Sequence, residues 1–186
     1  MARLSKLIIE GQQFVGKTTI ANNLARRYLW GNPFLFKLSG PSSGNDDRSF
    51  KGYVENVLLD YSNLFRHLSG NSVICDKFHI SEQVYGRIYR DYEHDPEFIE
   101  AVESILHPLG FKLIHLEMDD RLIEDRLALK EVEFQCKRQS LPAPSEQRRI
   151  KRLYERYVNR SRLQVIRVDV TGKSVLETVQ EIMGQL

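Results

Sequence analysis

Short runs of nearly continuous apolar residues recur along this chain, and each is followed by a stretch with helical periodicity. The runs cover residues 4–9, 34–38, 72–75, 111–116 and 163–168. Such runs are typical of strands that helices cover on both faces, whereas strands with one face in water alternate. The clearest helical spacing lies in 18–28 and 53–68. Strand and helix in alternation predict an α/β fold with a parallel sheet and right-handed crossovers.

The residues that follow the first apolar run match the pattern G-x-x-x-x-G-K-[ST], from Gly11 to Thr18. The match lies between a predicted strand and a predicted helix, which is the context in which this loop cradles phosphates with its main-chain N–H groups. Lys17 adds a full positive charge and is the first predicted catalytic residue. Thr18 is predicted to bind Mg²⁺ and Thr19 an α-phosphate oxygen. The complete predicted nucleotide-binding set is Gly11, Gln13, Phe14, Val15, Gly16, Lys17, Thr18 and Thr19, with Arg138 from a later segment.

Length and charge restrict the class of protein. A chain of 186 residues predicts one domain, residues 1–186. The net charge of +2, from 27 basic and 25 acidic residues, lacks the basic excess of a protein that coats nucleic acid or membrane. Two cysteines without metal-ligand spacing favour a reducing compartment, and no apolar segment is long enough for a membrane span. We therefore expect a cytoplasmic protein that binds no membrane.

A second segment, beginning at Asp76, makes the nucleotide prediction more specific. Residues 76–86 read DKFHISEQVYG and resemble the D-R-[YF]-x-x-S-x-x-A-Y-Q segment of thymidylate kinases. The matching positions are Asp76, Phe78, Ser81 and Tyr85. Residues 10–19 similarly resemble the E-G-x-[DE]-G-x-G-K-T-T loop of that family. The resemblance implies a three-layer P-loop NTPase fold whose five parallel strands, flanked by helices, follow the order 2-3-1-4-5, with a short lid.

Three positions depart from the family pattern. Thymidylate kinases usually carry Asp or Glu where this chain has Gln13, Arg where it has Lys77, and Gln where it has Gly86. The resemblance implies that these positions contact the sugar, the phosphate and the base of the acceptor. Lys77 keeps a positive charge but cannot clamp a phosphate bidentately as Arg can. The pattern therefore predicts phosphate binding and leaves the base open, dTMP or a related nucleotide.

Phosphoryl transfer requires positive charge around the moving group. The resemblance places a lid at about residues 119–144, and we expect Arg126 to act there as a catalytic residue. The alternative is an exposed helix arginine paired with a neighbouring acid. Asp76, at the end of an apolar strand, is also predicted to be catalytic, because it can hold Mg²⁺ through water or bond the Thr18 hydroxyl. A cap of the next helix is its alternative role.

The identity of the acceptor decides the reaction. A sugar hydroxyl needs a base, and deoxynucleoside kinases of similar fold carry a Glu after their second strand, where this chain has none. A monophosphate needs no base. Lys77 and a second cation, Arg48 in the predicted loop 39–48, favour a nucleoside monophosphate kinase that uses ATP and Mg²⁺, with a deoxynucleoside kinase as the alternative. The predicted acceptor contacts are Lys77, Phe78, Ser81, Tyr85, Arg48 and Phe36, the aromatic rings among them by stacking.

Four arginines recur at four-residue spacing on one predicted helix: Arg148, Arg152, Arg156 and Arg160. Like charges at this spacing repel one another. We favour the interpretation that they form a solvated helix face on which Glu146 and Glu155 offset the repulsion. The stripe also leaves open a polynucleotide-end kinase or a nucleic-acid-binding module that uses ATP only as a ligand. Since thymidylate kinases often dimerise, the resemblance further implies a homodimer.

Overall fold

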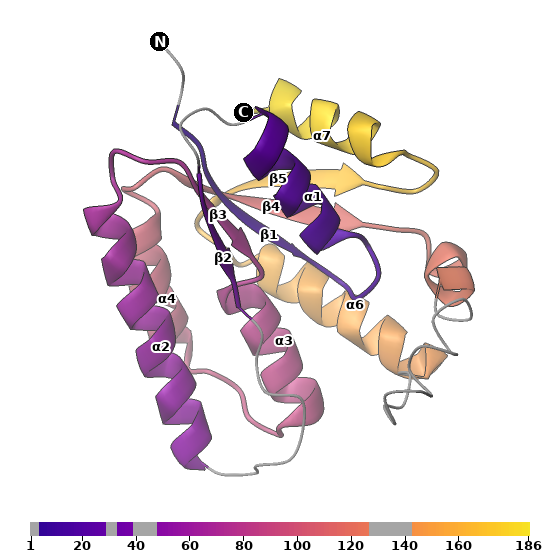
Figure 1. Cartoon of the computed structure of the whole chain (residues 1–186). Coiled ribbons are helices and arrows are strands. Elements are labelled where there is room, and N and C mark those ends of the chain that lie inside the picture. The colour runs from indigo at the N-terminus through magenta and orange to yellow at the C-terminus, as the bar shows by residue number, and fades with distance from the viewer. Residues whose placement is uncertain (1–3, 29–32, 39–47, 127–142) are drawn as a thin grey trace.

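The computed structural model describes residues 4–28, 33–38, 48–126 and 143–186 (Figure 1). Within these residues, five parallel strands form one sheet in the order β2-β3-β1-β4-β5. The strands are β1 (Lys6–Gly11), β2 (Phe34–Lys37), β3 (Val73–Asp76), β4 (Phe111–Glu117) and β5 (Gln164–Asp169). Each of the five apolar runs carries one strand, so the predicted parallel sheet and its strand order are confirmed.

Helices occupy the stretches between the strands. They are α1 (Lys17–Asn23), which continues into a π-helical turn, η1 (Leu24–Tyr28), then α2 (Arg48–His67), α3 (His79–Tyr89), α4 (Pro96–Leu106), α6 (Pro144–Val158) and α7 (Val175–Gly184). Residues 120–126 are also helical. Arg48, which was placed in the predicted loop 39–48, is the first residue of α2, and residues 39–47 lie outside the described residues. In the described part of the chain no helix is long and apolar enough to span a membrane.

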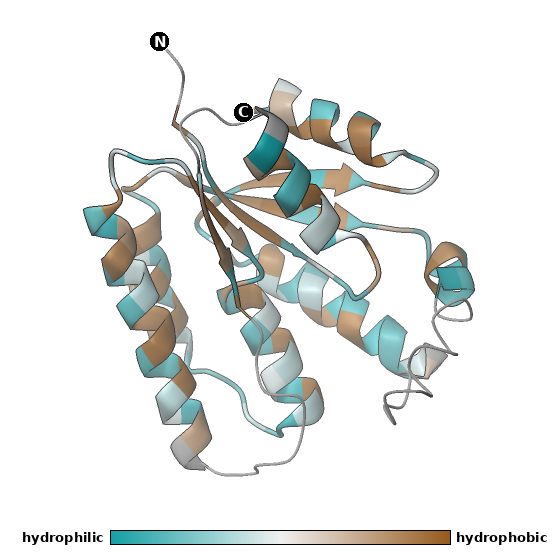
Figure 2. Ribbon diagram, viewed as in Figure 1, coloured by the Kyte–Doolittle hydropathy of each residue, from teal (hydrophilic) through white to brown (hydrophobic). Residues whose placement is uncertain are grey.

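The helices form a layer on each side of the sheet, with α1 and α7 on one side and α2, α3, α4 and α6 on the other (Figure 1). The central strand shows why its sequence is apolar throughout. Ile8 belongs to the core under α2 and α3, while Leu7 and Ile9 belong to the core under α1 and α7. Because successive side chains point to opposite faces, a strand buried on both sides cannot alternate with polar residues. Figure 2 shows the result as strands that are hydrophobic along most of their length.

The carboxyl ends of the three central strands lie level with one another. Ile9 pairs with Asp76 of β3 and with Ile114 of β4, and Glu10 pairs with His115 of β4. The phosphate-loop motif follows β1, and the segment that begins at Asp76 follows β3, so both leave the sheet at this edge. In open parallel sheets ligands bind at this edge.

Candidate active site

The phosphate loop turns sharply between β1 and α1. Gly11 has φ 143° and Gly16 has φ 93°, both in the region that residues with a side chain rarely adopt. A Cβ on Gly11 would also overlap the carbonyl oxygen of Leu116. Gly16 is the N-cap of α1, and no side chain caps this helix. The first N–H groups of α1 are therefore left to bind an anion.

Lys17 lies at the centre of the loop. Its Nζ donates hydrogen bonds to the carbonyl oxygens of Gly11, at 2.6 Å, and of Gln12. Burial lowers the pKa of Lys17 to about 8, and the positive charge of Lys77 adds to that effect, while the carboxylates of Glu10 and Asp76 oppose it. Lys17 is thus a buried ammonium group on main-chain carbonyls, with a second cation near enough to affect its titration.

Thr18 and Asp76 meet across the edge of the sheet. The Thr18 hydroxyl donates a hydrogen bond of 2.5 Å to Asp76 Oδ2, which is one of the two contacts predicted for Asp76. Asp76 Oδ1 is buried and has no hydrogen-bond partner. Asp76 does not cap the next helix, because the N-cap of α3 is Phe78.

These two side chains fit a hydrated Mg²⁺ ion. Mg²⁺ takes oxygen ligands, usually one or two from the protein with water and phosphate oxygens completing the shell. Asp76 Oδ1 and the Thr18 hydroxyl supply such oxygens. No group of three or more His, Cys, Asp or Glu side chains among the described residues could hold a metal by itself. The donor set suits an ion that arrives with a nucleotide.

Arg126 contacts the phosphate loop from the helical segment 120–126. Its Nη1 donates a 2.7 Å hydrogen bond to the carbonyl oxygen of Phe14. The Arg126 side chain is half-buried, whereas the alternative was an exposed arginine. Phe14 has φ 67°, a left-handed conformation uncommon for an aromatic residue. Arg138, the other arginine predicted to bind the nucleotide, lies outside the described residues, as does most of the predicted lid.

Three other residues of the loop motif differ in what they offer to a ligand. Val15 is buried in the core under α1 and α7, so only its main chain faces the loop. Gln13 is half-buried, and Thr19 is exposed in the first turn of α1. The neighbouring Gln12, which the sequence did not single out, donates from Nε2 to the carbonyl oxygen of Gln147 at 3.1 Å. This bond joins the loop to α6.

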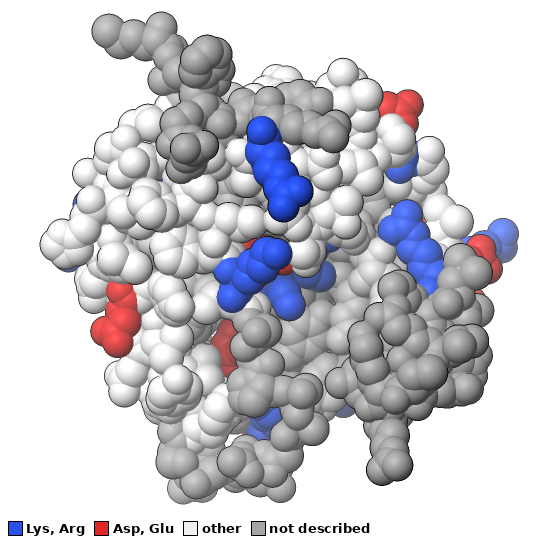
Figure 3. Space-filling model, viewed as in Figure 1, with Lys and Arg blue, Asp and Glu red and all other residues white. Residues whose placement is uncertain are grey.

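Lys77 lies between β3 and α3 in a left-handed conformation, with φ 71°. Its N–H donates a 3.0 Å hydrogen bond to the carbonyl oxygen of Ile9, at the end of β1. The positive charge of Lys77 lowers the pKa of Lys17. Figure 3 shows Lys and Arg side chains grouped near the middle of the viewed face, over the carboxyl ends of β2 and β3.

The predicted acceptor contacts on α3 are less exposed than the prediction requires. Phe78 is only 2% exposed, and its ring packs at 5.7 Å from that of Phe65 in the core. The Ser81 hydroxyl is buried and is bonded to Glu10 and, at 2.9 Å, to the Tyr154 hydroxyl. Neither side chain presents a free surface to a nucleotide, because packing and hydrogen bonds already occupy both.

The two remaining aromatic candidates are half-buried. Tyr85 stacks on Tyr89 at 5.8 Å, and its ring meets Tyr154 edge to face. Phe36, at the end of β2, packs edge to face against Phe65 at 5.1 Å. Tyr85 and Phe36 therefore keep part of their surface available. Arg48 begins α2, and its side chain lies outside the described residues.

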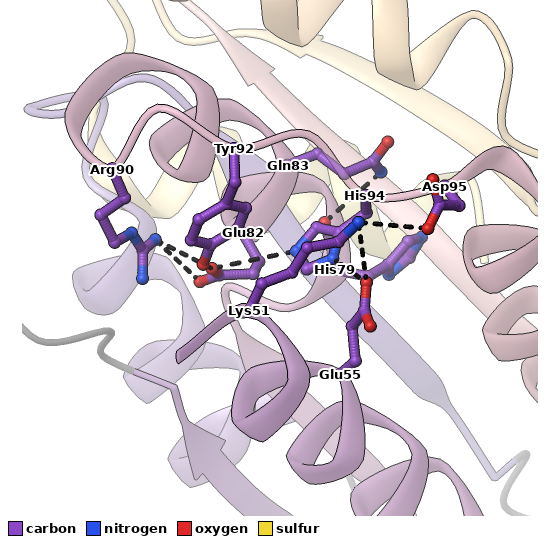
Figure 4. A network of polar contacts seen from close by, with 9 residues as sticks. All are labelled: Lys51, Glu55, His79, Glu82, Gln83, Arg90, Tyr92, His94 and Asp95. Atoms are coloured by element: carbon purple, nitrogen blue, oxygen red, sulfur yellow. Dashed lines mark hydrogen bonds and ion pairs between the residues drawn. The ribbon is translucent and has the colours of Figure 1, made fainter. Parts of the chain in front are cut away.

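A polar cluster between α2 and α3 was not predicted from the sequence (Figure 4). We name it the Glu82 cluster; it comprises Glu55, Glu82, Arg90, Tyr92 and His94. Arg90 Nη2 lies 2.9 and 3.0 Å from the two oxygens of Glu82, which also accepts a hydrogen bond from the Tyr92 hydroxyl. His94 Nδ1 lies 2.9 Å from Glu55 Oε1. Arg90 Nη1 and His94 Nε2 are buried and have no hydrogen-bond partner.

Tyr92 of the Glu82 cluster lies next to Gly86, the position where thymidylate kinases usually carry Gln. A Cβ on Gly86 would lie 2.6 Å from Cε2 of Tyr92. The Tyr92 ring therefore occupies the space that a larger side chain at position 86 would need. The Arg90 guanidinium lies 5.4 Å from the centres of the Tyr92 and Phe50 rings, which holds Tyr92 from another side. No local sequence pattern signals these contacts.

The four predicted arginines are exposed, but only Arg148, Arg152 and Arg156 lie on α6; Arg160 lies in the turn that follows, because the helix ends at Val158. The opposite face, which includes Ile150, Tyr154 and Val158, is buried. Within the described part of the chain, no ion pair forms between this stripe and Glu146 or Glu155, although Arg156 lies 5.9 Å over the Tyr157 ring. The described residues therefore show no direct contact by which Glu146 or Glu155 would offset the repulsion among these arginines.

A cavity of about 530 Å³ opens at the opposite, amino-terminal edge of the sheet. Its lining includes Lys6, His107 and Lys112. Both lysine ammonium groups already bond main-chain carbonyl oxygens, those of Ser69 and Leu186. It lies away from the phosphate loop, and we assign no ligand to it.

The architecture and the loop together define a P-loop kinase fold of the thymidylate kinase type. The YorR protein from Bacillus subtilis, solved in complex with phosphorylated GDP, matches 97% of this chain and 95% of its own at a TM-score of 0.71 and 21% identity. Thymidylate kinase from Candida albicans matches 100% of this chain and 92% of its own, with a TM-score of 0.61 and 17% identity. Deoxyadenosine kinase from M. mycoides with bound dCTP matches 97% of both chains, with a TM-score of 0.58 and 15% identity.

These likenesses are found by structure alone. No family model matches the sequence, and no curated protein sequence matches it either. At identities of 15–21% the solved structures establish a shared fold. What the protein binds and transfers must be argued from its own residues.

Proposed function

We propose that this protein is a nucleoside monophosphate kinase, which transfers the γ-phosphate of ATP to a (deoxy)nucleoside 5′-monophosphate. One observation carries the proposal. Lys17, from the loop after β1, and Lys77, from the loop after β3, lie at the same edge of the sheet: Ile9 pairs with Asp76, the Lys77 N–H bonds the carbonyl oxygen of Ile9 at 3.0 Å, and the charge of Lys77 lowers the pKa of Lys17. Two adjacent cations on different loops suit two phosphate groups, one from the donor and one from the acceptor.

The donor phosphates would lie on the loop 11–18. Main-chain N–H groups at the start of α1 would bind their oxygens, and Lys17 would exchange its carbonyl partners for the β- and γ-phosphates. Thr18 and Asp76 would hold Mg²⁺, which, when bound, neutralises the negative charge of the phosphates. Arg126, already on the Phe14 carbonyl, is within reach of the loop to stabilise the moving phosphoryl group.

Lys77 would bind the acceptor phosphate. In the reaction an acceptor phosphate oxygen forms the new bond to the γ-phosphorus, and the bond from that phosphorus to the β–γ bridging oxygen breaks, so the products are ADP and a nucleoside diphosphate. The attacking oxygen is already anionic and needs no general base. This agrees with the absence of an acid directly after β2, where the sequence continues Leu38, Ser39, Gly40, Pro41.

The base of the acceptor need not be thymine. Tyr92 fills the space beside Gly86. The surface that would face the acceptor base therefore differs from one with a glutamine at position 86. The structures with the same fold include proteins solved with phosphorylated GDP and with dCTP. We therefore propose that dTMP is one of several candidate acceptors.

A deoxynucleoside kinase is the second candidate, and Asp76 favours it. Its Oδ1 is buried without a partner at the carboxyl edge of the sheet, where it could accept the proton of a sugar hydroxyl. The same atom suits Mg²⁺ equally well, and Lys77 has no phosphate to bind in this reaction. With a monophosphate acceptor, Asp76 would hold Mg²⁺ and Lys77 would bind the acceptor phosphate, so both residues have a role.

An ADP-release assay tests the proposal directly. ATP and Mg²⁺ are offered with a panel of nucleosides, nucleoside monophosphates and 5′-hydroxyl oligonucleotides, and Lys17→Ala serves as the inactive control. Turnover with monophosphates supports the proposal. Activity confined to nucleosides would establish the second candidate, and activity confined to oligonucleotides a polynucleotide-end kinase. No activity, with ATP binding retained, would indicate a non-enzymatic nucleotide-binding module.

A further inference from the structure

Helix α3 begins without a cap of its own. Its N-cap residue is Phe78, whose side chain can accept no hydrogen bond from the main-chain N–H groups of the first turn, which have no partner within the helix. Glu10 of β1 supplies the missing acceptor. The Phe78 N–H donates to Glu10 Oε1 at 2.7 Å and the Ser81 N–H donates to the same oxygen at 3.2 Å, while the Ser81 hydroxyl donates to Oε2.

This carboxylate is fully buried. Burial raises the pKa of Glu10, whereas the Ser81 hydroxyl, the charge of His79 and the main-chain N–H groups of Phe78 and Ser81 oppose that shift. A buried carboxyl group is unfavourable unless hydrogen bonds satisfy it, and the amino end of a helix is a site that favours negative charge. The arrangement therefore has a specific partner for each oxygen of Glu10.

The cap also fixes the residue that precedes it. Lys77 has φ 71°, a conformation that lysine rarely adopts and that persists only where the surroundings enforce it. Its own N–H is bonded to Ile9, and the next N–H along the chain, that of Phe78, is bonded to Glu10. Two consecutive residues of β1 therefore hold the two peptide groups on either side of Lys77.

We propose that Glu10 is a positioning residue for the acceptor site: by capping α3 across the sheet, it holds Lys77 in its left-handed conformation at the edge of the sheet that also carries the phosphate loop. Ser81 acts in the same cap, with its hydroxyl between Glu10 and Tyr154, and does not contact the acceptor. The role of Lys77 in binding an acceptor phosphate rests on the function proposed above. The cap itself does not, and it can be tested separately.

Amide hydrogen exchange tests the cap. Glu10→Met keeps the volume but leaves the Phe78 and Ser81 N–H groups without an acceptor, so these amides should exchange at least about tenfold faster. Glu10→Gln keeps an acceptor oxygen for both, and its amide group can donate to the Ser81 hydroxyl, so protection should return. Tyr154→Phe is the matched control, because it removes a hydroxyl from Ser81 and leaves the main-chain bonds intact. If Glu10→Met does not fold, Glu10→Asp, which withdraws the carboxylate by one methylene group, replaces it.

Kinetics test the effect on Lys77. With the best monophosphate of the panel, Glu10→Met should raise the acceptor KM about tenfold and leave the ATP KM within about threefold. The double variant Glu10→Met/Lys77→Ala should be no worse than Lys77→Ala alone, because both changes remove the same contact. Glu10→Gln should restore the acceptor KM.

Three results would overturn the proposal: unchanged exchange at Phe78 and Ser81 in Glu10→Met, additive effects in the double variant, or equal loss for both substrates. If the native protein transfers phosphate to no monophosphate, the proposed function fails. The exchange experiment then still decides whether Glu10 caps α3.

Discussion

The proposed donor side and the proposed acceptor side of this site are built in different ways. On the donor side, residues 11–18 form one continuous loop, and Thr18 reaches Asp76 directly. On the proposed acceptor side, the N–H groups of Lys77 and Phe78 are bonded to β1, and the Glu82 cluster joins α2, α3 and the segment after α3. The donor side is thus a local motif, whereas the acceptor side is an assembly of distant parts.

The comparison suggests where a protein of this fold can change its specificity. The loop must present main-chain N–H groups and one ammonium group to a triphosphate, so few substitutions are compatible with its geometry. The proposed acceptor wall instead includes packing between side chains, such as that of Arg90 on Tyr92. We therefore expect donor-side substitutions to abolish transfer and acceptor-side substitutions to redistribute it among acceptors.

The largest effect is expected from Lys17→Ala. Loss of the ammonium group should lower kcat by at least about 10²–10³-fold, the range for removing one group that stabilises transition-state charge. The fold should persist, because burial already disfavours this charge, and thermal unfolding checks that point. Lys112→Ala, at the opposite edge of the sheet, is the control and should keep normal turnover. Near-normal turnover of Lys17→Ala would refute the donor site.

Lys77→Ala should separate the two sides. We expect the acceptor KM to rise about 10–100-fold, since hydrogen bonds to charged groups contribute about 1.5–3 kcal/mol. The ATP KM should change by less than about threefold. Steady-state kinetics with each substrate varied in turn measure both, and Lys77→Arg should retain much of the activity. An effect confined to ATP would contradict the role of Lys77.

The pH dependence of ATP binding tests whether the two sides are coupled. Phosphates stabilise the Lys17 ammonium, so the pKa of Lys17 is higher in the complex than its value of about 8 in the free protein. Above pH 8 binding must take up a proton, and the Kd of MgATP should rise by up to about tenfold per pH unit. Below pH 8 it should stay flat. Calorimetry between pH 7 and 10, in two buffers of different ionisation enthalpy, measures the Kd and the proton uptake.

Lys77→Ala provides the control for this titration. Because the charge of Lys77 lowers the pKa of Lys17, its removal should move the rise in Kd to higher pH. A Kd that stays flat to pH 9.5 in the native protein would show that Lys17 keeps its proton in the free state. An unshifted curve in Lys77→Ala would show that the two cations are not coupled.

The smallest effect is expected from Gly86→Ala. The new methyl group would press on a Tyr92 ring held by Glu82 and Arg90, and overpacking costs about 1–3 kcal/mol. Alanine regains about 1 kcal/mol of helix propensity, so we expect a net destabilisation of about 1 kcal/mol, measured by denaturant unfolding. In a Tyr92→Leu background the same change should be neutral or stabilising. A stabilising effect in the native background would show that Tyr92 moves freely.

Much of the fold and half of the site follow from the sequence. Continuous apolar runs predict buried parallel strands, because each face of such a strand must lie under a helix. The loop from Gly11 to Thr18 is predictable because its function depends on glycine conformations and main-chain groups that a local pattern specifies. The Asp76 segment identifies the third strand and the hydroxyl partner of Thr18.

The tertiary structure decided the contacts between residues far apart in the chain. Phe78 and Ser81 match a family pattern, but packing places one in the core and hydrogen bonds place the other under Glu10. Arg126 reaches Phe14 across 112 positions, and Tyr92 closes over Gly86. Each residue type is ordinary in its own segment. Its partner is set only when the sheet order and the helix packing bring the two segments together, because hydrogen bonds and ring contacts act over a few ångströms and depend on orientation.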